Sequence, residues 1–90
     1  MELAEILKLR PETSANDWHQ HSNGGGWVQN TAKVAASAYV GVNAVISQNA
    51  RVGDYASVYD NAQVFWNAVV SGDVHIFGNS RVSEIGRAHV

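Results

Sequence analysis

A chain of 90 residues with six basic and eight acidic side chains has room for one small domain and carries a formal net charge of −2. This balance gives no positive surface for nucleic acid or an anionic membrane, so neither is expected as a partner. The chain has no Cys, which excludes disulfides, thiolate metal sites and cysteine nucleophiles.

The first ten residues are predicted to form a short amphipathic helix. Leu3, Ile6 and Leu7 stand at helical spacing, and the chain's single Pro follows at the end of the pattern. Glu2 and Glu5 occupy the region where a secretory signal peptide carries positive charge. We therefore expect no signal peptide in this segment, and the protein is either cytoplasmic or part of a larger exported chain.

Residues 11–26 are rich in Gly, Ser, Thr and Asn, which favour turns, and are predicted to be an irregular connector. Together with the helix they make an N-terminal lead and capping connector over residues 1–26. Trp27 comes next, directly before a regular repeat, and its large indole, with that of Trp18, is expected to cover the apolar end of the first repeat.

Two features of the connector could bind a ligand, but each has a simpler interpretation. His19 and His21 stand two residues apart near Asp17 and could share a metal ion, yet no convincing third ligand accompanies them. The run Gly24–Gly26 could present N–H groups to an anion, but no Lys or Ser/Thr follows at P-loop spacing. A solvated loop and a turn are favoured, and we predict no metal and no cofactor.

Residues 27–83 are built on a repeat of six. Every sixth residue is Val or Ile, and the residue four places after it is small, most often Ala. Taking the aliphatic residue as position one, positions five, six and one alternate small, variable and aliphatic, which predicts a short strand with positions five and one facing inward. The predicted core comprises Val28, Val34, Val40, Ile46, Val52, Val58, Val64, Val70, Ile76 and Val82.

Position four of the hexad is predicted to be a corner. It carries an Asn in five hexads, and Asn tolerates left-handed backbone well. With 18 residues to a coil, these side chains would stack as amide ladders that satisfy one another. The ladder residues are Asn43, Asn61 and Asn79 at one corner and Asn49 and Asn67 at another.

The hexad pattern resembles the left-handed parallel β-helix of the bacterial hexapeptide-repeat superfamily. The resemblance covers Val28 to Val82, about three coils. It implies an all-β fold in which three hexads form one triangular, left-handed coil, preceded by a short helix or irregular lead. The opening segment SNGGGWVQNTAKVAASAYVGVNAVIS is also similar to hexapeptide-rich accessory modules at the ends of larger bacterial proteins.

Exposed aromatic side chains are the best candidates for a contact surface. Stacking with an 18-residue period predicts two groups at outward positions, which are Tyr39, Tyr59, His75 and Phe77 on one face and Phe65 and Trp66 near another corner. Protein or carbohydrate could bind there, and packing of three copies, as in many members of the superfamily, is equally compatible. End-to-end association of solenoids is a further possibility.

This chain lacks the residues that catalytic proteins of this fold use. The resemblance implies that acyltransferases use a His beside a projecting loop and that carbonic anhydrases of this fold use three His ligands, whereas His75 stands alone in uninterrupted hexads. The resemblance also implies that ice-binding proteins of this fold carry rows of Thr. This chain has only Thr13 and Thr31, so ice binding is not expected. We predict a non-catalytic structural or interaction module; the alternative is a truncated hexapeptide-repeat acyltransferase whose catalytic loop and acyl-CoA site are missing.

The period fails after Val82. Ala88 stands where the next aliphatic residue is due, and Ile85 stands where Asn or Asp is usual. Residues 84–90 also back-translate to a sequence that resembles a short-read sequencing adapter. We interpret them as non-native and expect the natural gene to continue past Ser83, as part of a longer bacterial protein.

Overall fold

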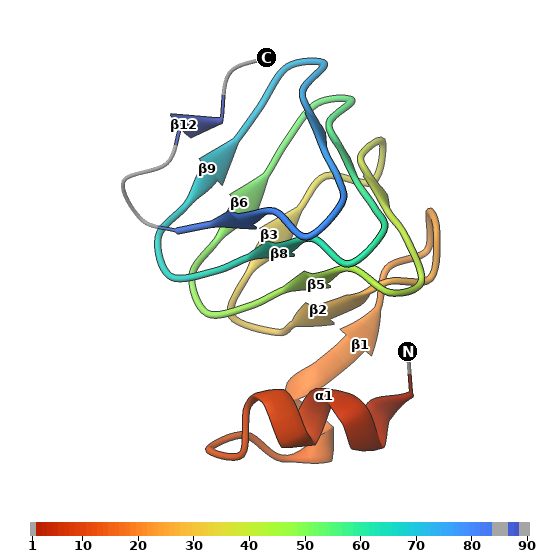
Figure 1. Cartoon of the computed structure of the whole chain (residues 1–90), viewed down its shortest axis with the longest axis vertical. Helices are drawn as coiled ribbons and strands as arrows, with labels where there is room; N and C mark the ends of the chain where they lie inside the picture. Colours follow the sequence, from red (N-terminus) through yellow and green to blue (C-terminus); the bar gives the residue numbers. More distant parts are fainter. Residues whose placement is uncertain (1, 84–86, 89–90) are drawn as a thin grey trace.

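The computed structural model describes residues 2–83 and 87–88, and it is a solenoid of short strands (Figure 1). In chain order the elements are α1 (Leu3–Leu9), a 3-10 turn (Ala15–Asp17), β1 (Trp18–Gln20), β2 (Trp27–Gln29), β3 (Lys33–Val34), β4 (Tyr39–Val40), β5 (Val45–Ile46), β6 (Arg51–Val52), β7 (Ser57–Val58), β8 (Gln63–Val64), β9 (Val69–Val70), β10 (His75–Ile76), β11 (Arg81–Val82) and β12 (Arg87–Ala88).

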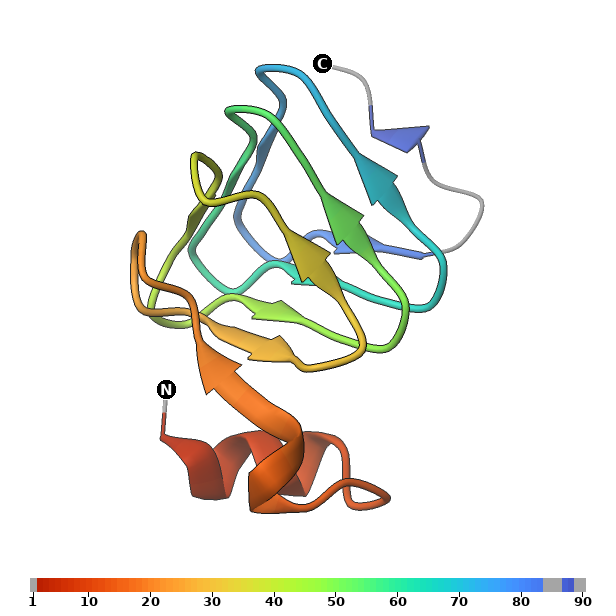
Figure 2. The ribbon, with the colours of Figure 1, turned by 180° about the vertical axis from the view of Figure 1, so that it is seen from behind.

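Every third strand joins the same sheet, so three sheets of parallel strands surround a common core (Figures 1 and 2). We call them sheet A (β2, β5, β8, β11, with β1 at its edge), sheet B (β3, β6, β9, β12) and sheet C (β4, β7, β10). Lys33 pairs with Arg51, and Arg51 pairs with Val69, which sets a coil of 18 residues. The predicted fold class, a mostly-β parallel solenoid of about three turns with one short N-terminal helix, is confirmed.

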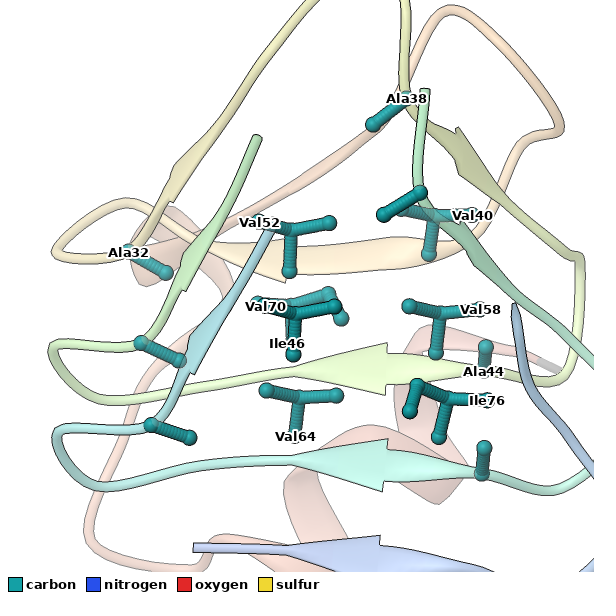
Figure 3. Close-up of a cluster of buried hydrophobic side chains, with 14 of the residues drawn as sticks. Ala32, Ala38, Val40, Ala44, Ile46, Val52, Val58, Val64, Val70 and Ile76 are labelled. Atoms are coloured by element: carbon teal, nitrogen blue, oxygen red, sulfur yellow. The ribbon is translucent and has the colours of Figure 1, made fainter. Parts of the chain in front are cut away.

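The interior is filled by hexad positions one and five, as Figure 3 shows. Val and Ile suit short strands because their branched side chains pack well on a pleated surface, and Ala fits where the walls converge. Eight of the predicted core residues are buried, and Val34 and Val82, near the two ends of the stack, are only partly buried against the same cluster. The buried eight are Val28, Val40, Ile46, Val52, Val58, Val64, Val70 and Ile76.

From the second coil onward the left-handed residue of each corner is at position three, so the prediction that Asn at position four takes this conformation is wrong. Within the described residues the positive φ values recur every six residues from the second coil onward, at Gln48, Asp54, Asp60, Trp66, Gly72 and Gly78. The corner turns one residue earlier than composition suggested, and in the second coil the position-three side chain has a bonding role that its residue type did not reveal.

That role is to join one coil to the next. The side chain of Gln48 accepts a hydrogen bond from the backbone N–H of Trp66 at 2.7 Å. In the same way Asp54 accepts from Gly72 at 3.0 Å, and Asp60 accepts from the residue 18 places later at 3.1 Å. Each bond satisfies an N–H that the corner takes out of the strand ladder.

The Asn residues of position four lie exposed at the corners. Their backbones also link coils: the N–H of Asn49 donates to the carbonyl of Trp66 at 2.8 Å, and that of Asn61 donates to the carbonyl of Gly78 at 3.0 Å. The proposed amide ladders of Asn43, Asn61 and Asn79 and of Asn49 and Asn67 stay a prediction.

The N-terminal helix lies on the outer face of sheet A (Figure 1). Ile6 is fully buried against Trp18 and Val45, and Leu3, Leu7 and Trp27 pack around them. Both indoles therefore cover the side of the solenoid, and the prediction that they close the end of the first coil is wrong. The reason is that Trp27 occupies hexad position six, whose side chains point outward.

The first coil is bordered instead by the connector, which is more regular than predicted. Its strand β1 pairs antiparallel with β2. The loop that follows runs along β4: the N–H of Gly26 donates to the carbonyl of Val40 at 2.9 Å, and the N–H of Val40 donates to the carbonyl of Asn23 at 3.0 Å. A Cβ on Gly26 would collide with Val40 and with the next carbonyl, so this approach requires Gly.

At the other end, Arg87 and Ala88 pair with Val69 and Val70 and continue the 18-residue register. Residues 84–86, 89 and 90 lie outside the described residues, and the interpretation of 84–90 as non-native stays a prediction. No helix in the described chain is long and apolar enough to cross a membrane.

Candidate functional site

Four aromatic side chains gather on the outer side of sheet C, and we call this group the aromatic face: Tyr39, Tyr59, His75 and Phe77. Strand pairing places Tyr39 and His75 on either side of Ser57, in one column. Tyr59 and Phe77 are hexad position two of consecutive coils and form the next column. Tyr39 is 40% exposed and Phe77 is 52% exposed, so the face is open to a partner.

The rings of the aromatic face contact one another. Tyr59 and Phe77 stack with centroids 5.6 Å apart and planes 13° from parallel, and the ring of His75 meets Tyr59 edge-on at 6.2 Å. Gly41 lies beneath: a Cβ there would stand 3.1 Å from the Cβ of Tyr59. These contacts restrict the side chains before any partner binds, which reduces the entropy lost on association.

A shallow hollow of about 310 Å³ borders the aromatic face at the corner after β4. Tyr39 and Tyr59 line it together with the polar residues Asn43 and Asp60. The side chain of Asp60 also bonds across the coils, as described above. The hollow therefore offers both aromatic and polar side chains to a partner.

The second predicted group, Phe65 and Trp66, lies apart from the aromatic face, at the corner that follows β8. Their rings meet edge-on at 6.2 Å. Phe65 is flanked by two cations, with the guanidinium carbons of Arg10 at 5.5 Å and Arg81 at 5.3 Å from its ring centre. Arg10 also donates a long hydrogen bond of 3.4 Å to the buried hydroxyl of Ser47. Phe65 thus holds the end of the N-terminal helix against sheet A.

Trp66 is half exposed and has a φ of 57°, a conformation that is rare for a bulky side chain. A left-handed backbone costs an L-residue about 1–2 kcal/mol, and Gly avoids this cost. We expect Trp66→Gly to be more stable than Trp66→Ala by about 1 kcal/mol, because both variants lose the contacts of the indole and only Gly removes the backbone cost. Trp66→Ala keeps the backbone cost and serves as the control. Urea denaturation measures both; equal stability of the two variants would contradict this explanation.

The His residues of the lead are engaged in hydrogen bonds. The Nε2–H of buried His21 donates to the carbonyl of Ala38 at 2.8 Å, and the Nδ1–H of His19 donates to the side-chain oxygen of Asn30 at 2.6 Å. Their rings therefore serve different partners. In the described part of the chain, His, Asp and Glu side chains form no group of three that could hold a metal ion.

Comparison of the chain with known protein families, curated proteins and solved structures found no match. Functional inference therefore depends on the fold and on the surfaces described above.

Proposed function

We propose that the chain is a non-catalytic interaction module built on a left-handed hexapeptide β-helix. The period of six, the inward Val or Ile of each hexad and the 18-residue coil support this assignment. Within the described residues the hexads from Val28 to Val82 run without an inserted loop. No observation favours the alternative of a truncated acyltransferase.

The aromatic face is the proposed contact surface, and a protein surface is its proposed partner. The observation that carries the proposal is the open ring cluster on sheet C. Tyr59 and Phe77 stack against each other, so each ring covers one face of its neighbour. Clustered, exposed aromatic side chains are typical of the centre of protein interfaces, which supports a protein partner.

A second copy of the chain is the partner we would test first, since flat sheet walls suit assembly of several solenoids. Truncating the exposed rings, as in Tyr39→Ser/Phe77→Ser, is expected to raise the concentration for half-assembly by about tenfold or more, because a central aromatic often contributes about 2 kcal/mol to an interface. Sedimentation velocity over a concentration series measures this shift.

Tyr55→Ser is the matched control, because Tyr55 is 71% exposed and is not part of the aromatic face. It should assemble like the unmodified chain. Self-association through this face is contradicted if the unmodified chain stays monomeric at millimolar concentration, or if Tyr55→Ser weakens assembly as much as the double variant.

A further inference from the structure

The outer side of sheet B carries a hollow of a different character. It measures about 410 Å³ and lies over β3, β6 and β9, which form one wall of the solenoid (Figure 1). Two cationic side chains, two amides, a hydroxyl and an aliphatic side chain line it, and we call it the basic hollow: Thr31, Lys33, Asn49, Arg51, Asn67 and Val69. None of the carboxylates in the described part of the chain lines it, although the chain as a whole is slightly acidic.

Lys33 and Arg51 stand directly opposite each other on adjacent parallel strands. Both are exposed and therefore project from the same side of sheet B. Like charges in this position repel and destabilise a strand pair. Among the described residues neither cation has an ion pair or a hydrogen bond to offset this repulsion, so an anion bound between them would relieve it.

The remaining polar groups suit the same ligand. Asn49 and Asn67 line the hollow one coil apart, together with the cations, and each side-chain amide can donate two N–H groups. The hydroxyl of Thr31 already donates to the carbonyl of Gln48, so Thr31 borders the hollow without being one of its donors. A guanidinium, an ammonium and amide N–H groups around one hollow are the donors that recognise an oxyanion.

We propose that the basic hollow binds a tetrahedral oxyanion, which is a phosphate or sulfate group, free or carried by a larger molecule. The site is on sheet B, whereas the aromatic face is on sheet C, so this proposal does not depend on the proposed function. The attraction is local, because the net charge of −2 gives no general affinity for anions.

The test is a titration of the ¹⁵N-labelled chain with inorganic phosphate, at constant ionic strength made up with chloride and at constant pH. Saturable shifts are expected for the side-chain amides of Asn49 and Asn67 and for the backbone amides of Lys33 and Arg51. A parallel titration with sulfate should give the same pattern, and one with acetate should be weaker. Absence of saturable shifts, or saturation by acetate alone, would overturn the proposal.

Lys33→Gln/Arg51→Gln should weaken phosphate binding by about tenfold or more, since it removes the charge-assisted hydrogen bonds. Lys8→Gln/Arg81→Gln makes the same change in net charge away from the hollow and should bind phosphate like the unmodified chain. Without phosphate, the first double variant should melt at the same or a slightly higher temperature, because the opposed charges are gone. Equal phosphate affinity in the two double variants would contradict the site.

Discussion

Val70→Asp is expected to unfold the solenoid, whereas Val69→Asp should be tolerated. Val70 has no exposed surface and belongs to the core cluster, so an Asp there would place a carboxylate among aliphatic side chains without a partner. Burial of an unpaired polar or charged group costs several kcal/mol, which is a large part of the 5–15 kcal/mol that holds a typical small domain together. Thermal unfolding followed by circular dichroism measures the loss.

Val69 is a close control because it is the same residue type, on the same strand, with 44% of its surface exposed. Its side chain points outward from sheet B, so a carboxylate there stays in water. We expect a change of about 0.5 kcal/mol or less, as for most surface substitutions. If both variants melted at similar temperatures, the inward and outward assignment of the hexad positions would be wrong.

The interior of the solenoid could be predicted from the sequence because one physical requirement fixes it. A strand alternates its side chains between two faces, so a Val or Ile every six residues with a small residue four places later defines the buried positions without knowledge of any contact. The same arithmetic predicted the columns of the aromatic face, since Tyr39 and His75 are separated by two coils. Which rings touch, and at what angle, depends on side-chain packing that the repeat does not specify.

The position of the left-handed residue in each corner was predicted wrongly, because it was inferred from the preference of Asn for that conformation. Asn is frequent at position four, but the left-handed residue is at position three, where Gln48, Asp54 and even Trp66 occur. What these positions share is a hydrogen bond between coils, and only the packing of one coil on the next reveals it. An acidic or amide residue just before the Asn, as in Gln48 and Asp60, was the available signal.

The hexad pattern could not predict that the N-terminal helix covers sheet A, because this contact also depends on packing between distant parts of the chain. Val45 stands at hexad position six, where most side chains are exposed or only partly buried, yet it is only 3% exposed. Its burial depends on a segment some forty residues earlier in the chain, and no period links the two. The one hint was composition, because Val45 is aliphatic where several equivalent positions carry Lys, Arg, Gln or Ser.

Ile6→Ala is expected to lower the free energy of unfolding by about 2–4 kcal/mol, because it leaves a cavity in the small cluster that joins the helix to sheet A. Ile6 is fully buried there against Trp18 and Val45. Both Trp18 and Trp27 belong to this cluster, so urea denaturation followed by Trp fluorescence reports on it directly.

Leu9→Ala is the matched control, since Leu9 is an aliphatic residue on the same helix with 43% of its surface exposed. It should change stability by about 0.5 kcal/mol or less. A helix of seven residues is too short to be stable alone, so its order depends on this docking. Ile6→Ala should therefore also speed amide exchange throughout α1, which Leu9→Ala should not do. Equal exchange in the two variants would mean that contact with Val45 does not hold the helix in place.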